Sequence, residues 1–231
     1  EFSFLTRDYA SSMTSFDRYF AGAERSDGKD GNALDRTLVM TAEVYADPGL
    51  GAKKLKHYLT KLPKESPLAQ RTQSWIDVLD RVKSDETSLL SPSQKTTVSK
   101  LDAYLDNQWP AINSMLSWSE QEAYSVVIRG QLNRLLQRTT DKNDAPKLLY
   151  WLAVSDRATH YRFYNSLSRG YLETCIEHHP DHPYGRRCLA EYAWLILVVF
   201  SGYSGKHIPT EVSERLEMLR SLTKGHKIKP R

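Results

Sequence analysis

The residues whose side chains could bind a metal, form a disulfide or act in catalysis lie in one short segment. It is YLETCIEHHPDHPYGRRCLAEYAWLILVVF, residues 171–200. This segment holds both cysteines of the chain and three of its seven histidines: Cys175, His178, His179, His182 and Cys188. Thiolates and imidazoles are ligands for Zn²⁺, and a thiolate beside an imidazole can act as a nucleophile. Two nearby cysteines can instead form a disulfide or remain two separate buried thiols.

The spacing favours a disulfide between Cys175 and Cys188. Leu167, Tyr171 and Cys175 recur every four residues, so Cys175 is predicted on the buried stripe of a helix, near its end. Cys188 falls about one turn into the next helix. A helix end, a tight turn and a helix start can bring the two Cβ atoms within the roughly 4 Å that a disulfide needs. Closing so short a loop would stabilise the fold by up to about 3 kcal/mol. Two free, separately buried thiols are the alternative.

A zinc site is the second alternative for this segment. Its ligands would be Cys175, His178 or His179, His182 and Cys188. The spacing C-x₂-H-H-x₂-H-x₅-C matches none of the standard structural-zinc arrangements, and a turn bracketed by two prolines restricts how the ligands converge. Histidines in such a turn normally face solvent. A catalytic Cys-His pair has less support, because no third group nearby would orient the imidazole.

Helical periodicity dominates the elements that must position these residues. Apolar side chains recur at i, i+3, i+4 and i+7 in residues 51–62, 119–138 and 210–222. Residues 37–46, TLVMTAEVYA, alternate as a strand would, but we favour a helix because an isolated strand would have no partner. The apolar run AWLILVVF, residues 193–200, is far shorter than the roughly 18 residues that cross a bilayer, and we expect a buried turn or two of helix. The sequence therefore predicts an all-α fold.

Segments rich in helix-breaking residues are predicted to form loops between the helices. GAERSDGKDGN, residues 22–32, is predicted to be a loop from its Gly and Asp content. A second loop around residues 85–93 is the best candidate boundary between an N-terminal helical segment, residues 1–83, and a C-terminal one, residues 84–231. One continuous domain is the alternative.

Two stretches share the order helix, proline, polar residues, second proline, helix. They are LKHYLTKLPKESPLAQRTQSWIDVL and YLETCIEHHPDHPYGRRCLAEYAWLI. Pro63 and Pro180 should each end a helix, because proline lacks a donor and clashes with the preceding turn. Pro67 and Pro183 should each open the next helix, because their fixed φ suits a first turn. Two antiparallel helical hairpins are expected.

This turn chemistry resembles the junction between successive tetratricopeptide repeats, especially the divergent ones of bacterial envelope proteins. The step from Pro146 in PKLLYWLA to Pro183 in PYGRRCLA is 37 residues, close to the roughly 34 of that family. The resemblance covers residues 34–82 and 145–222. It implies antiparallel hairpins stacked in a right-handed solenoid, or an irregular helical bundle, with a concave face that binds a protein or peptide.

Aromatic and arginine side chains crowd one helical pair of the second region. The candidate partner-binding residues are Tyr150, Trp151, Arg157, Tyr161, Arg162 and Tyr164. Tyr, Trp and Arg are the residues enriched at binding hot spots. Aromatic stripes at helical spacing also occur as ordinary core packing, which is the alternative for this cluster.

The composition and net charge of the chain argue against a nucleic-acid partner. The chain has 231 residues, 40% of them hydrophobic and 26% charged, which is ordinary for a globular protein with a sizeable core. A formal net charge of +4 is too small and too dispersed to indicate nucleic acid, and the basic end KGHKIKPR reads as a solvated tail. No cofactor motif is present. We expect a protein partner.

The chain opens on Glu1-Phe2 without an initiating Met, so we expect that an upstream signal or anchor was removed. The closely spaced cysteines favour an oxidising compartment, the periplasm or a periplasm-facing membrane anchor, with the cytoplasm as the alternative. The leading hypothesis is a non-enzymatic helical-repeat adaptor that binds a partner protein in the bacterial cell envelope. The alternative is a helical metal-dependent hydrolase that uses Cys175, His178, His182 and Cys188.

Overall fold

Prolines and side-chain caps fix where the helices of both expected hairpins begin. The computed structural model describes residues 2–22, 26–85, 89–91, 96–114, 117–159, 167–202, 205–206 and 208–224. In the first hairpin α4 (Pro48–Leu59) is followed by α5 (Pro67–Ser84), and Ser66 caps α5 by accepting a hydrogen bond from the Ala69 amide at 3.1 Å. In the second, α9 (Ser168–His178) is followed by α10 (Pro183–Val199). Both predicted hairpins are confirmed.

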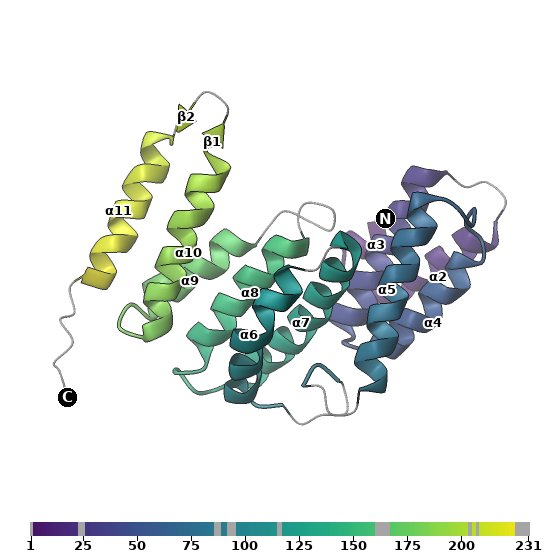
Figure 1. The fold of residues 1–231 in the computed structure, drawn as a ribbon, viewed down its shortest axis with the longest axis horizontal. Coiled ribbons are helices and arrows are strands. Elements are labelled where there is room, and N and C mark those ends of the chain that lie inside the picture. The colour runs from purple at the N-terminus through teal and green to yellow at the C-terminus, as the bar shows by residue number, and fades with distance from the viewer. Residues whose placement is uncertain are drawn as a thin grey trace.

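The remaining elements are also helices, apart from one short pair of strands (Figure 1). They are α1 (Phe2–Leu5), α2 (Tyr9–Ala21), α3 (Asp27–Leu38), α6 (Val98–Asn113), α7 (Trp118–Arg138), α8 (Ala145–Thr159) and α11 (Thr210–Lys224). Strands β1 (Ser201–Gly202) and β2 (Gly205–Lys206) pair antiparallel over two residues each. The described part of the chain is therefore essentially all-α, as predicted.

The segment with strand-like alternation is helical, and part of it is a π-helix. α3 runs directly into η1 (Val39–Val44), where the Tyr45 amide donates to the Met40 carbonyl at 2.9 Å, five residues back. π-turns are rare and need tertiary support. Here η1 packs against α7, where Gly130 lets the two backbones approach so closely that a Cβ would collide with the Ala42 carbonyl. The helical interpretation of residues 37–46 is confirmed.

The predicted loop at residues 22–32 is wrong over its second half. α3 already begins at Asp27, so the Gly- and Asp-rich stretch that follows is helical. Asp30 is buried and its carboxylate accepts a hydrogen bond from the Tyr19 hydroxyl at 2.5 Å, while Leu34 is wholly buried one turn later. Tertiary packing thus overrides the weak helix propensity of Gly and Asp.

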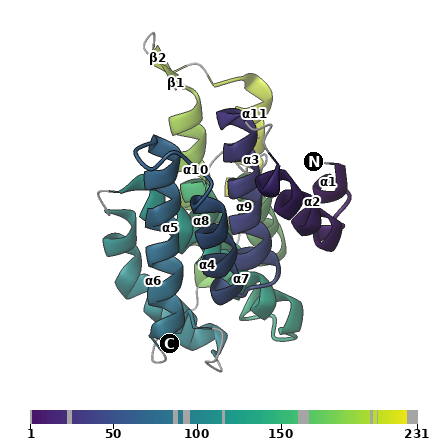
Figure 2. The same cartoon turned by 90° about the vertical axis from the view of Figure 1, so that its right-hand side faces the viewer.

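Buried side chains form two clusters. The larger contains residues from Phe4 to Val154 and crosses residue 84 without a break. At the crossing, the Glu122 carboxylate of α7 accepts hydrogen bonds from the α5 side chains Arg71 at 3.2 Å and Trp75 at 3.3 Å. The smaller cluster, from Leu149 to Leu219, lies among α8, α9, α10 and α11. Figure 2 shows α3, α4 and α5 in front of the helices that carry it.

The helices of the C-terminal half stack in chain order. α8 packs against α6, α7, α9 and α10, and α10 packs against α9 and α11. Tyr150 of α8 contacts Tyr184 of α10, and two turns later Arg157 contacts Glu191. α8 and α10 therefore run parallel, with α9 returning between them. This arrangement positions the side chains of the candidate site.

Candidate partner-binding groove

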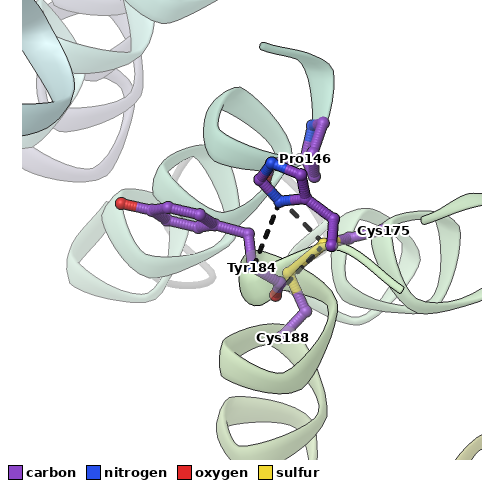
Figure 3. The surroundings of a disulfide bond; sticks show 5 residues. Pro146, Cys175, Tyr184 and Cys188 are labelled. Carbon is purple, nitrogen blue, oxygen red and sulfur yellow. Dashed lines mark hydrogen bonds between the residues drawn. A yellow bond between two sulfur atoms is a disulfide. The ribbon is translucent and has the colours of Figure 1, made fainter. Parts of the chain in front are cut away.

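The two cysteines meet between α9 and α10 (Figure 3). The Sγ atoms of Cys175 and Cys188 are 2.22 Å apart and the Cα atoms 6.4 Å apart, and both side chains are fully buried. Cys175 Sγ also lies 3.7 Å from the Pro146 carbonyl oxygen and 3.6 Å from that of Tyr184. The predicted pairing of the two cysteines is confirmed as a geometry at disulfide distance.

The histidines of the turn do not join the sulfurs. His178 is exposed at the end of α9, whereas His182 caps α10 by accepting a hydrogen bond from the Tyr184 amide at Nδ1, at 3.2 Å. Burial lowers the pKa of His182, and the charge of Lys147 lowers it further. In the described ranges no three His, Cys, Asp or Glu side chains converge on a site for a metal ion. The set Cys175, His178, His182 and Cys188 does not fit zinc, because the two sulfurs lie at disulfide distance and leave no thiolate to bind a metal.

Trp151, predicted to face a partner, is a core residue. It is 3% exposed, and its Nε1 donates to Asp102 of α6 at 2.8 Å. Tyr150 is half-buried, with its ring centroid 5.4 Å from that of Tyr184 and the Arg187 guanidinium 4.4 Å above it. These side chains hold α6, α8 and α10 together and have little surface to offer.

Arg157 is the predicted residue that reaches a surface groove. One of its Nη atoms lies 2.5 Å from Glu191 of α10, and its guanidinium stacks 4.3 Å from the ring centroid of Trp194. The other predicted members, Tyr161, Arg162 and Tyr164, lie outside the described residues. Arg157 thus lines the groove beside an aromatic residue, Trp194, that the sequence did not indicate, and its role in binding a partner stays a prediction.

The groove has a volume of about 570 Å³ and lies between α10 and the junction of α6 with α7. One wall is formed by α10 side chains at i, i+3, i+4 and i+7: Glu191, Trp194, Leu195 and Val198, hereafter the α10 wall. Val154 and Arg157 of α8, Arg169 of α9, and Trp118 and Gln121 of α7 line the other sides. The groove is therefore mostly apolar, with polar groups on its rim.

The apolar run of α10 is not buried as predicted. Trp194 is 49% exposed, Val198 51% and Val199 60%, whereas Ile196 in the same run is 3% exposed and belongs to the smaller core cluster. A helix with apolar residues on every face needs neighbouring elements on every face to bury them. The helices α8, α9 and α11 cover only part of α10. The rest of its apolar surface faces solvent and the groove.

Charged and amide side chains on the rim of the groove pair with neighbouring side chains of the protein. Gln121 donates to the Asn113 side-chain oxygen at 3.1 Å, and Arg169 donates to Glu173 at 2.7 Å. Arg157 and Glu191 neutralise each other. The groove therefore offers apolar contact and little uncompensated charge.

Sequence reasoning missed Trp118 and Trp194, the two large aromatic residues of the groove. Trp118 opens α7 and is 65% exposed. A usable signal existed for Trp194: seven consecutive apolar residues on one helix, Ala193 to Val199, exceed the face that a single core can cover. No such signal existed for Trp118, because its exposure depends on how α6 meets α7.

Among the described helices, none combines the length and apolarity that a membrane crossing requires. Comparison with protein-family models, with curated proteins and with solved structures finds no match to this chain. Function is therefore inferred from the groove itself.

Proposed function

We propose that this protein is a non-enzymatic helical-repeat adaptor that holds a partner protein in the groove beside α10. The observation that carries the proposal is the exposure of Trp194 and Val198 in a groove of about 570 Å³. Exposed apolar residues gathered at a concave site mark a binding surface, whereas apolar residues scattered singly do not. Trp and Arg are also the side chains that most often carry binding energy.

The helix order supports a repeat-like scaffold. Parallel α8 and α10, each followed by an antiparallel partner, is the arrangement that stacked helical hairpins produce. In such stacks the surface away from the returning helices is free to bind. A tetratricopeptide-like solenoid remains part of the proposal.

We assign the protein to an oxidising compartment, the bacterial periplasm in the first instance. The cysteine pair at disulfide distance supports this assignment, because disulfides persist in oxidising compartments and are rare in the cytosol.

Site-specific photo-crosslinking in the source cells tests the adaptor function. The crosslinker p-benzoylphenylalanine is placed at Trp194, with Met218 of α11 as the matched control, because Met218 is 45% exposed but lies outside the groove. We expect one dominant protein adduct from position 194 that is absent from position 218. Equal adducts from both positions, or none from 194, would contradict the proposal.

A further inference from the structure

We infer that the groove takes a short amphipathic α-helix of the partner protein, with an uncharged apolar face, rather than an extended peptide. This inference rests on the proposed adaptor function and specifies the chemistry of the partner. Three features of the groove carry it: its wall, its hydrogen-bonding capacity and its charge.

The α10 wall is built for helix packing. Its members recur at i, i+3, i+4 and i+7, which is the ridge by which one helix packs into the groove of another. The eight residues from Glu191 to Val198 rise about 10 Å at 1.5 Å per residue. An occupant of two to three turns therefore spans the wall.

An extended peptide would lose hydrogen bonds in this groove. Its backbone amides and carbonyls need partners, because an unpaired buried polar group costs free energy. Leu195 and Val198 supply none, Trp194 supplies a single indole donor, and the Gln121 amide group already donates to Asn113. A helix satisfies its own backbone and presents only side chains, so it meets the apolar wall without that loss.

The charges of the groove exclude an acidic or basic occupant face. Arg157 is paired with Glu191 at 2.5 Å, and Arg169 with Glu173 at 2.7 Å. A charged group entering between these pairs would be desolvated without a free counterion. The face of the incoming helix is therefore apolar and uncharged.

The size of the site favours a partner helix over a second copy of this chain. A stable dimer usually buries about 800 Å² on each side, from about 20–30 residues. The groove is lined by far fewer residues than that, and only the C-terminal half of α10 contributes to it. A single helix can fill it, whereas a symmetric dimer would need further surface.

Peptide selection against the intact, oxidised chain tests the inference. One library randomises a single face of a scaffolded helix, and the other presents linear peptides held extended by flanking prolines. Groove binders are those that lose at least 10-fold in affinity with Val198→Asp and less than 2-fold with Met218→Asp. Val198 and Met218 are similarly exposed, so far-UV circular dichroism should show both variants folded.

We expect the helix library to yield groove binders with an apolar, uncharged face, and Trp194→Ala to weaken them at least 10-fold. Groove binders from the extended library alone, binders with a charged face, or no binder from either library would overturn the inference. So would a dimer of the unliganded chain that Val198→Asp abolishes in sedimentation velocity.

The two proposals fail in distinguishable ways. If the segment crosslinked at position 194 is extended, the helix inference fails and the adaptor function stands. If the helix library binds but no cellular adduct forms, the adaptor function fails and the groove chemistry stands.

Discussion

At the scale of single residues, His182 shows how one titratable side chain can decide a helix start. Its Nδ1 accepts the Tyr184 amide hydrogen bond only while the ring nitrogen is unprotonated. Burial, aided by Lys147, lowers the pKa of His182, which keeps the ring neutral in the folded protein. The cap and the lowered pKa therefore describe the same preference for the neutral form.

We predict that stability falls as pH drops below the ordinary histidine pKa of about 6.5. In that range the unfolded chain binds a proton at His182 that the folded chain resists, and stability rises with pH wherever the unfolded state binds more protons. His182→Asn keeps an acceptor that does not titrate and should flatten the melting temperature between pH 7.5 and 5. His182→Ala should cost about 1 kcal/mol at pH 7.5. His178→Asn at an exposed site is the control, and an equal flattening there would contradict the assignment.

Arg129 is the centre of a buried ion-pair network that joins several helices. It is 1% exposed, and its guanidinium bonds Asp156 and lies 3.0 Å from Glu43 of η1. The other Asp156 oxygen accepts the amide of Leu167, the N-cap of α9, at 2.7 Å. Four elements, η1, α7, α8 and α9, meet at this network.

We predict that Arg129→Met destabilises the protein by about 3–5 kcal/mol, because it leaves a buried carboxylate without its counterion. Chemical denaturation measures the loss. Arg220→Ala, which breaks an exposed pair with Glu217, should change the free energy of unfolding by less than about 1 kcal/mol. Similar losses of unfolding free energy in the two variants would show that the buried network stabilises the fold no more than an exposed ion pair does.

At the scale of elements, η1 depends on one glycine of a distant helix. A Cβ at position 130 would meet the Ala42 carbonyl and the Glu43 Cα. We predict that Gly130→Ala costs about 1–3 kcal/mol by forcing backbone apart. Gly170→Ala in α9 is the matched control, because nothing lies within 4 Å of its added Cβ, and it should stabilise by about 0.5–1 kcal/mol. Thermal melts of both variants check the opposite signs.

The hairpin of α9 and α10 carries the cysteine pair. We predict that thiol titration of the unreduced, denatured protein finds essentially no free thiol, and that reduction lowers stability by up to about 3 kcal/mol. The double variant Cys175→Ala/Cys188→Ala should melt at the same temperature with and without reductant. Two reactive thiols in fresh unreduced protein would refute the disulfide.

Local chemistry explains which elements could be predicted. The α9–α10 hairpin follows from Pro180 and Pro183, because proline acts on its own neighbours in sequence. The π-helix η1 could not be predicted, because it depends on Gly130, a residue far away in the chain. The second half of the 22–32 loop was mispredicted for the same reason: Asp30 is held in a helix by Tyr19.

The candidate site was predictable only in part. Arg157 was predicted among the partner-binding residues because arginine is enriched at hot spots, and it does line the groove. Trp151 was predicted to face a partner but is buried, and Trp194 was predicted to be buried but is exposed. Residue type sets how much apolar surface a helix carries, but the neighbouring helices determine which part of it is covered.

At the scale of the whole molecule, the larger core cluster joins the two expected segments. Trp75 of α5 is fully buried and donates to Glu122 of α7. We predict that residues 1–84 and 85–231, expressed separately, each lose cooperative unfolding, because the cut exposes Trp75 and removes the Arg71 and Trp75 hydrogen bonds to Glu122. Circular dichroism melts and tryptophan emission report the loss. A sharp melt of either fragment at the temperature of the whole chain would establish independent domains.

The covalent link between α9 and α10 also changes what a single cut in the backbone can do. The turn between these helices contains the exposed residue Asp181, and it lies inside the loop that the two cysteines close. A protease that cleaves there severs the chain without releasing α10 and α11, since the sulfur bridge still tethers them. The cleaved protein would migrate as one band without reductant and as two with it. A protein built this way keeps the α10 wall attached after a nick that would otherwise release it.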